Sequence, residues 1–201
     1  NIRKVGIMSQ YYFIRFVEKT AWFLKLYIIQ YRNLLLFLAV FVLFYIFFMH
    51  WLNVRLLNQL RRPAAIACMV IELVAIAYFT ILFRETGTSH TYELELFWSY
   101  KQWIFGGNIW LGMEILNNIL LFFPLGFVLS DALNSSSFWS ALLIPLFVSS
   151  TIEISQLLFK LGLFEFDDIF NNVLGAIAGW CVFHILRSFR SRKRNNDHMG
   201  R

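Results

Sequence analysis

Five long apolar stretches constrain the fold of this 201-residue chain more than any other feature of its sequence. A helix that crosses a bilayer needs about 20 consecutive, mostly apolar residues. The stretches that approach this length are residues 34–52, 63–83, 113–130, 138–159 and 169–186. Charged residues make up only 15% of the chain, against about 25% in soluble domains. We therefore predict an all-α integral membrane protein with about five transmembrane helices, and we exclude a soluble enzyme, a disordered tail and a secreted disulfide scaffold.

Residues 7–31 predict a helix of another kind, because their polar and apolar residues separate. The charged residues of this segment and its border fall within about 140° of a helical wheel: Arg15, Glu18, Lys19, Lys25 and Arg32. Aromatic and aliphatic residues take most of the other side. We predict an N-terminal amphipathic helix that lies at the membrane interface. Packing against the other helices and a sixth crossing are the alternatives.

These elements divide the chain into three predicted parts. Residues 1–62 hold the amphipathic helix and the first span, residues 63–186 a four-helix membrane domain, and residues 187–201 a basic tail. Lys and Arg in short loops favour the cytoplasmic side, but their counts on the two sides are equal here. The tie breaks toward a cytoplasmic C-terminus if the N-terminal helix is interfacial or crosses the membrane, because the tail is dense in Arg and Lys.

Polar residues gather at one end of four of the predicted spans. Any two of these groups are separated by no crossing or by an even number of crossings. We therefore expect all of them at one membrane surface, which is the extracytoplasmic one in the chosen orientation. Ionisable groups within spans are costly and usually face the bundle interior. The residues that end or open these spans include Glu114 and Asn171, and our candidates for ligand binding are Arg84, Asn117, Asn118, Glu153, Gln156, Asp167, Asp168 and Asn172.

Each of these residues also has a structural interpretation. Asp167 or Asp168 could cap the fifth span, and Arg84 is the expected counter-charge for Glu153 or Asp168, because guanidinium suits desolvated carboxylates. The convergence of one Arg, several carboxylates and four amides at one depth favours a site. Glu72, in the middle of the second span, has no evident partner, and we predict only that it faces inward.

Small residues predict where the helices pack closely. Gly175 and Gly179 follow Asp168 and Asn172 on one stripe of the fifth span and allow another backbone to approach. Pro124 and Gly126 predict a kink in the third span. Residues 84–112 are rich in Trp, Phe and Tyr, which suit the headgroup layer. We expect this segment to anchor at the interface or to cover the polar cluster.

Three motifs in this order resemble the VanZ family of bacterial membrane proteins. Residues 118–126 are similar to its Asn-x3-Phe-x-Pro-x-Gly segment, residues 153–156 to its Glu-x-x-Gln, and residues 167–175 to its Asp-Asp-x3-Asn-x2-Gly signature. The matching run covers residues 63–186. The chain departs from the family in its first external loop and at Leu163, where an Arg often precedes the Asp-Asp pair.

The resemblance implies a multi-pass protein of the bacterial cytoplasmic membrane with a role in resistance to teicoplanin, a glycopeptide, or in envelope-lipid handling. We expect a non-enzymatic protein that binds an amphiphile through an outer-leaflet polar site. The expected partners are membrane lipids, and a lipid-linked cell-wall precursor or a lipoglycopeptide; nucleic acid is not expected. The alternative is an intramembrane enzyme or a flippase acting on a lipid or lipid-linked precursor. We predict no catalytic residue, metal or cofactor.

Overall fold

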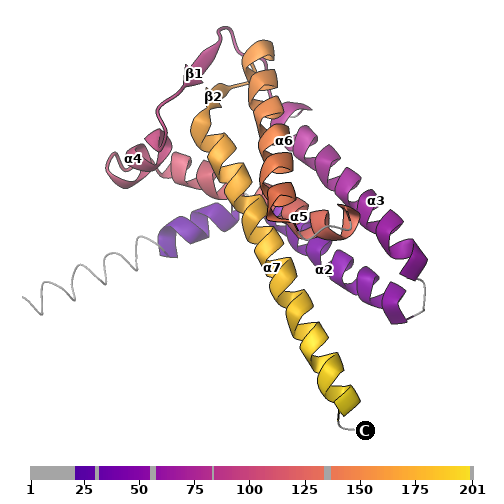
Figure 1. Cartoon of the computed structure of the whole chain (residues 1–201). Helices are drawn as coiled ribbons and strands as arrows, with labels where there is room; N and C mark the ends of the chain where they lie inside the picture. Colours follow the sequence, from indigo (N-terminus) through magenta and orange to yellow (C-terminus); the bar gives the residue numbers. More distant parts are fainter. Residues whose placement is uncertain (1–20, 30–31, 55–57, 83, 134–136, 200–201) are drawn as a thin grey trace, which may run out of the picture. The chain divides into compact units, whose positions relative to one another are not determined.

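The computed structural model describes residues 21–29, 32–54, 58–82, 84–133 and 137–199. Its helices are α2 (Arg32–Val54), α3 (Asn58–Ala77), the π-helical turn η1 (Tyr78–Leu82), α4 (Trp98–Ile104), α5 (Ile109–Leu133), α6 (Phe138–Phe159) and α7 (Phe166–Met199). Two three-residue strands, β1 (Thr91–Glu93) and β2 (Leu163–Glu165), complete the described elements (Figure 1). The prediction of an all-α membrane bundle is confirmed, with this small strand pair as an addition.

The chain forms two compact units, Asn1–Val40 and Phe41–Arg201. In the first unit, residues 21–29 are helical and α2 begins. These nine residues belong to the amphipathic helix predicted over residues 7–31, whose other residues lie outside the described part of the chain. The second unit holds the remaining elements and all of the predicted site residues.

Four described helices are long and apolar enough to cross a membrane: Gln59–Leu82, Ile109–Leu133, Phe138–Phe159 and Phe166–Phe189. They correspond to the last four predicted stretches. Three of them begin earlier than predicted, and at the starts of the first and the last, polar residues are already helical. The first predicted stretch, residues 34–52, falls within α2, several of whose side chains are outside the description.

Helix α5 is the central helix of the second unit. It packs against α3, α4, α6 and α7. In its most apolar window 61% of residues are buried, against 28% in the windows of α3 and α6. Its buried face includes Phe122, Leu125 and Val128, each completely buried. Because these side chains are buried from both lipid and water, α5 is the element around which the other helices pack.

Three glycines allow α5 and α7 to approach until their backbones touch. A Cβ atom on Gly126 would lie 1.8 Å from the carbonyl oxygen of Ala176, and one on Gly175 would lie 2.1 Å from that of Ile119. At Gly179 the corresponding distance, to the carbonyl oxygen of Phe123, is 2.0 Å. No side chain fits at such distances, so glycine is required at all three positions. We call this contact the glycine seam. Helix α5 continues as one helix through the buried Pro124.

The strands β1 and β2 form a parallel pair that the sequence did not predict. Thr91 pairs with Leu163, Tyr92 with Phe164, and Glu93 with Glu165. They lie together near the point where α6 ends and α7 begins (Figure 1). The pair therefore fastens the segment after α3 to the segment that leads into α7.

A second group of polar contacts lies farther along the bundle, near the C-terminal end of α5. Asp131 accepts hydrogen bonds from Arg61 Nη2 at 2.8 Å and from the hydroxyl of Tyr45 at 2.8 Å. At the preceding residue of α5, Ser130 Oγ and His184 Nε2 lie 3.1 Å apart. Since Asp131 is largely buried (9% exposed) and fully bonded, this group ties α2, α3 and α5 together.

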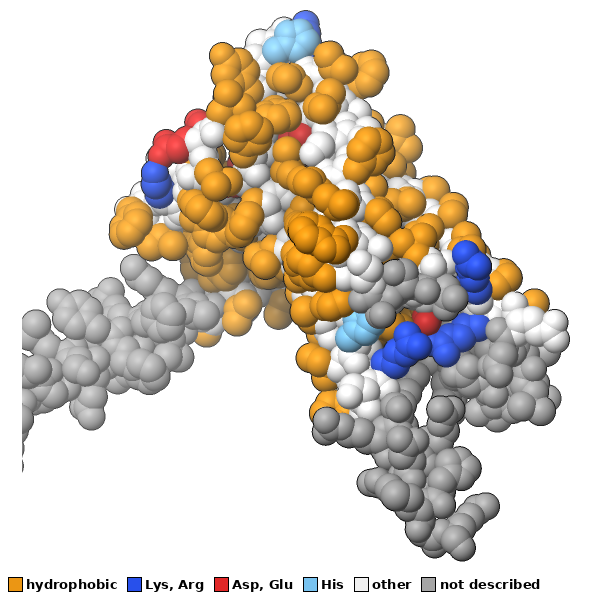
Figure 2. Space-filling model, in the orientation of Figure 1, with side chains coloured by type: hydrophobic (Ala, Val, Ile, Leu, Met, Phe, Trp, Pro, Cys, Tyr) orange, Lys and Arg blue, Asp and Glu red, His pale blue; other side chains and the backbone are white. Residues whose placement is uncertain are grey.

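Hydrophobic side chains cover most of the outer surface seen in Figure 2, and charged side chains gather in a few places. The exposed residues include Val74 (63% exposed) on α3 and Phe147 (74%) on α6. A soluble protein would bury residues of this size, whereas a bilayer solvates them. The apolar surface therefore agrees with helices that lie in lipid.

Candidate functional site

The predicted polar residues of α6 and α7 meet beneath the strand pair. The carboxylate of Glu153 accepts a hydrogen bond from the backbone N–H of Glu165 at 3.1 Å. Gln156 Nε2 donates to the carbonyl oxygen of Thr80 at 3.0 Å, and Asn172 Nδ2 donates to Ser149 Oγ at 2.8 Å. These three predicted residues are at most 3% exposed. They fasten β2, η1, α6 and α7 to one another.

Beside them lies a cavity of about 270 Å³. It is lined by Arg84, Trp98, Leu111, Glu114, Asn117, Asn118, Leu163, Glu165 and Asp168. Four of the eight predicted ligand-binding residues therefore line it: Arg84, Asn117, Asn118 and Asp168. The other four, Glu153, Gln156, Asp167 and Asn172, are not in its lining. The structure thus separates the predicted cluster into a cavity wall and a layer of polar residues bonded within the protein.

The charged residues of the cavity wall are almost free of protein partners. The carboxylates of Glu114, Glu165 and Asp168 accept no hydrogen bond and form no ion pair with any residue in the described ranges. Among the residues that the structure describes, Arg84 donates a hydrogen bond only to the carbonyl oxygen of Leu161, from Nη1 at 3.5 Å. Side chains with this much unused hydrogen-bonding capacity around one space are suited to a polar guest molecule.

Arg84 does not pair as predicted. It makes no ion pair within 4 Å of a carboxylate in the described part of the chain, although its charge acts on Glu114, Glu153 and Asp168. Its guanidinium instead lies over Gly162, where an added Cβ would be 2.4 Å from Arg84 Nη1. The exposed position keeps this cation in a high-dielectric environment, so full pairing with a buried carboxylate is not required.

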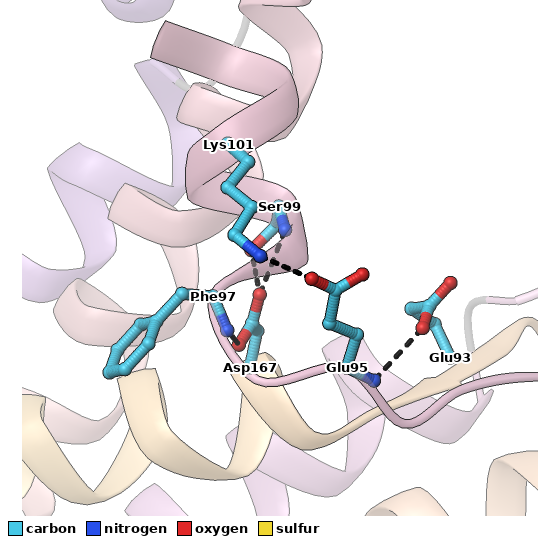
Figure 3. A network of polar contacts seen from close by, with 6 residues as sticks. All are labelled: Glu93, Glu95, Phe97, Ser99, Lys101 and Asp167. Atoms are coloured by element: carbon cyan, nitrogen blue, oxygen red, sulfur yellow. Dashed lines mark hydrogen bonds and ion pairs between the residues drawn. The ribbon is translucent and has the colours of Figure 1, made fainter. Parts of the chain in front are cut away.

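Asp167 has a structural role that differs from both predicted ones. Its carboxylate accepts hydrogen bonds from the backbone N–H groups of Phe97 and Ser99, at 2.5 Å and 2.8 Å, and from the Ser99 hydroxyl (Figure 3). Phe97 is the N-cap of α4 and has a left-handed backbone (φ 64°) without a side-chain cap of its own. A carboxylate from α7 therefore caps the start of α4, where the helix dipole favours negative charge.

The same attachment continues at the next residue of α4. The Tyr100 hydroxyl donates to Asn171 Oδ1 at 2.5 Å, and Asn171 is completely buried. Burial, with the negative charge of Asp167 as a further cause, raises the pKa of Tyr100. Tyr100 therefore stays a neutral hydrogen-bond donor. The aromatic segment is thus held to α7 by specific polar bonds, beyond the interfacial anchoring that its composition predicts.

Glu165 is the cavity residue that the sequence analysis missed. It is 7% exposed, and burial raises the pKa of its carboxyl to about 8, with the nearby charges of Asp168 and Glu114 as further causes. The local signal is a glutamate between two phenylalanines, Phe164 and Phe166, directly before the Asp-Asp pair. A charged residue in so apolar a context indicates a buried polar environment.

Three buried amide atoms of the polar layer have no hydrogen-bond partner in the described structure: Gln156 Oε1, Asn171 Nδ2 and Asn172 Oδ1. Each such atom costs about 1–3 kcal/mol when it stays unsatisfied. Within the described ranges, no group of three or more His, Cys, Asp or Glu residues has the arrangement of a metal site. The side chains of the cavity wall can offer hydrogen bonds and ion pairs to a ligand.

The fold and the cavity together define a small helical membrane protein with a polar cavity at one end of its bundle. Residues 64–187, more than half of the chain, match the VanZ/LLP1 family. The chain belongs to this family, which confirms the resemblance seen in its motifs. It is also 25% identical over 81 residues to Protein VanZ of Enterococcus faecium, a match that covers 40% of this chain and 50% of that protein. The chain thus spans about half the length of this curated relative. No solved structure matches the chain.

Proposed function

We propose that this protein binds the headgroup of an amphiphile in the cavity at one surface of the bacterial cytoplasmic membrane. The observation that carries the proposal is the set of charged side chains around one space, Arg84, Glu114, Glu165 and Asp168, which have no ion-pair partner in the described chain. Charged groups without ion-pair partners are costly next to a bilayer, so a polar ligand that pairs with them would stabilise the protein.

Aromatic residues near the cavity support a location in the headgroup layer. Tyr92, Phe105 and Trp110 are 65%, 86% and 62% exposed, and amphipathic rings concentrate where the bilayer meets water. A headgroup in the cavity would leave its acyl tails beside the apolar surfaces of the helices. This arrangement requires an amphiphile rather than a soluble metabolite.

The charge distribution supports a cavity on the outer side of the membrane. Asp168, in the first turn of α7, lines the cavity, and α7 runs on from there toward the C-terminus (Figure 1). The cavity and the C-terminal end of α7 therefore lie on opposite sides of the membrane. With the Arg-rich tail in the cytoplasm, as the charge distribution favours, the cavity faces the outer leaflet, where glycopeptides meet cell-wall precursors.

The family resemblance implies the biological setting, which is resistance to teicoplanin. A protein that holds an outer-leaflet lipid or lipid-linked precursor alters the access of a lipid-tailed glycopeptide to its target. The partners that fit this setting are membrane lipids, a lipid-linked cell-wall precursor and the lipoglycopeptide itself. In all three cases the protein acts by binding and needs no covalent chemistry.

The proposal is tested by combining Arg84→Gln with Asp168→Asn, which removes both signs of charge from the cavity with little change in shape. Wild-type protein in a susceptible Gram-positive host should raise the inhibitory concentration of teicoplanin, and the double variant should lose this protection. Purified wild-type protein should also retain lipid in native mass spectrometry, and the double variant should retain less.

The matched control is Glu95→Gln, an exposed glutamate whose partner, Lys101, also lies outside the cavity (Figure 3). It should keep both the protection and the bound lipid. Full protection by the double variant at equal membrane levels would contradict a role for the cavity. No protection by the wild type would overturn the role in resistance, and equal lipid retention by both proteins would overturn headgroup binding.

Glu72 is the observation that favours a second function, movement of a lipid across the membrane. It is completely buried in α3, and neither of its carboxylate oxygens has a hydrogen-bond partner in the described structure. Buried acids of this kind occur in proton relays of transporters. Scrambling of a fluorescent lipid in liposomes that contain the protein, abolished by Glu72→Gln, would support this function; scrambling that survives the change would remove it.

A further inference from the structure

Acidic side chains outnumber basic ones in the cavity wall. Three carboxylates line it, Glu114 from α5, Glu165 from β2 and Asp168 from α7, against one guanidinium, that of Arg84. Glu93, Glu153 and Asp167 stand close enough for their charges to act on these groups. Lys101, which does not line the cavity, pairs with Glu95. An anionic headgroup would meet one favourable charge and several acidic groups whose ionised forms repel it.

Glu165 is an acidic group that a ligand in the cavity could use. Its side chain is 7% exposed, it lines the cavity, and its carboxylate has neither hydrogen bond nor ion pair from the described residues. Its backbone N–H is already used by Glu153. A cation that enters the cavity would stabilise the ionised carboxylate in this position. Charge-assisted hydrogen bonds are stronger than neutral ones, and a low dielectric constant strengthens the attraction further.

Trp98 adds a second feature of a cation site. It lines the same cavity, and the face of an indole ring attracts ammonium groups. The volume, about 270 Å³, lies just below the usual range of small-molecule pockets. It accommodates a lipid headgroup and excludes a whole glycopeptide.

Building on the proposed headgroup binding, we infer that the preferred ligand is a membrane lipid whose headgroup carries both an ammonium group and a phosphate. The ammonium group lies among Glu114, Glu165 and Asp168, and the phosphate faces Arg84. An amino-phospholipid such as phosphatidylethanolamine has this chemistry. A lipid with phosphate alone leaves the carboxylates unpaired, and a soluble phosphoamine lacks the tails that hold it at the membrane.

The inference predicts a direction for the pH dependence of binding. Burial and the charges of Asp168, Glu114, Asp167 and Glu93 raise the pKa of Glu165 to about 8, so at neutral pH this carboxyl is mostly protonated. An ammonium group binds the deprotonated form better. The affinity for the amino-phospholipid should therefore rise as the pH increases through about 8 and should level off above that value.

The experiment uses the purified full chain in lipid nanodiscs or neutral detergent, with native mass spectrometry as the readout. The probes are phosphatidylethanolamine, its N-acetyl derivative and phosphatidylglycerol with identical acyl chains, together with free phosphoethanolamine. The wild type should prefer phosphatidylethanolamine to its N-acetyl derivative by about tenfold or more, the value of one good charged interaction. Free phosphoethanolamine should bind far more weakly.

Two variants and one control make the result decisive. Glu165→Gln with Asp168→Asn should reduce the preference for the free amine to about twofold or less while phosphatidylglycerol binding is kept or increased, because repulsion falls. Asn118→Asp adds a carboxylate to the wall and should strengthen the preference. Glu95→Gln should change neither. Retained phosphatidylglycerol binding also shows that the double variant is folded.

The outcomes separate the two proposals. Equal binding of all three lipids by the wild type, or an unchanged preference in Glu165→Gln with Asp168→Asn, would overturn the ammonium preference and leave headgroup binding standing. Failure of every lipid to bind would overturn the proposed function itself. Equal binding of the soluble phosphoamine would show that the site reads a free metabolite, which overturns the lipid source.

Discussion

Replacing Gly126 by alanine should separate the two helices that carry opposite walls of the cavity. The new Cβ would lie 1.8 Å from the carbonyl oxygen of Ala176, about 1.5 Å closer than an ordinary C···O contact of about 3.3 Å. The atom in its way belongs to the backbone of α7 and cannot rotate aside. Helices α5 and α7 must therefore move apart by about that amount.

The loss of stability follows from the packing that is lost when α5 and α7 move apart. Adding a methyl group to a well-packed core costs about 1–3 kcal/mol, and a backbone obstacle places this change at the upper end, about 3 kcal/mol. For a chain of this length such a loss lowers the unfolding midpoint by about 6–12 °C. Gly175→Ala and Gly179→Ala, with Cβ distances of 2.1 Å and 2.0 Å to backbone oxygens, should have similar effects.

Thermal unfolding in detergent with a thiol-reactive fluorescent dye measures this loss directly. Cys68 is 5% exposed, so it reacts when the bundle opens, and a Cys181→Ser background removes the second thiol. The control is Ala67→Val on the exposed face of α3, which adds more atoms but meets lipid. Midpoints of the glycine variants equal to that of the control would refute the close contact of α5 and α7.

Three further changes test other contacts. Asp167→Ala should destabilise the chain by about 2 kcal/mol and raise trypsin cleavage at Lys101, because the start of α4 loses the hydrogen bonds of its charged cap; unchanged proteolysis would contradict the cap. Asp131→Ala should cost about 3 kcal/mol, since it leaves Arg61 partly buried without its partner, and a simultaneous Arg61→Met should recover part of the loss in the same dye assay. Glu72→Met should raise the unfolding midpoint, because a buried acid without hydrogen bonds is replaced by an apolar side chain of similar size; a lower midpoint would show that Glu72 has a partner that stabilises it.

The sequence predicted the spans and most of the polar residues because both depend on local patterns. Apolar length alone located the helices, and the distribution of polar residues at span ends indicated one common surface. The predicted start was four residues late for α5, although residues 109–112 are mostly apolar, and three residues late for α7, where Asp167 and Asp168 are already helical. Polarity at a helix start is a weak guide to where the helix begins.

The separation of the site into a cavity wall and a bonded layer could not be predicted in this way. Asp167 and Asp168 are adjacent in sequence, yet one caps α4 and the other lines the cavity, because successive helical side chains point about 100° apart. Which of them faces the cavity depends on the position of α4, and α4 is held by long-range bonds. The strand pair could not be predicted either, because three residues are too few to show a periodic pattern.

The attachment of the aromatic segment at two nearby points has a consequence for its tolerance of length changes. Strand β1 ends at Glu93 in register with β2, and Phe97 is bonded to Asp167 on α7. Only residues 94–96 lie between these two points. Deleting one of them shortens the bend and turn between two fixed points, so the strand pair or the cap of α4 must shift, whereas an insertion there can bulge outward. Natural and engineered variants of this protein should therefore accept added residues at this position far more readily than lost ones.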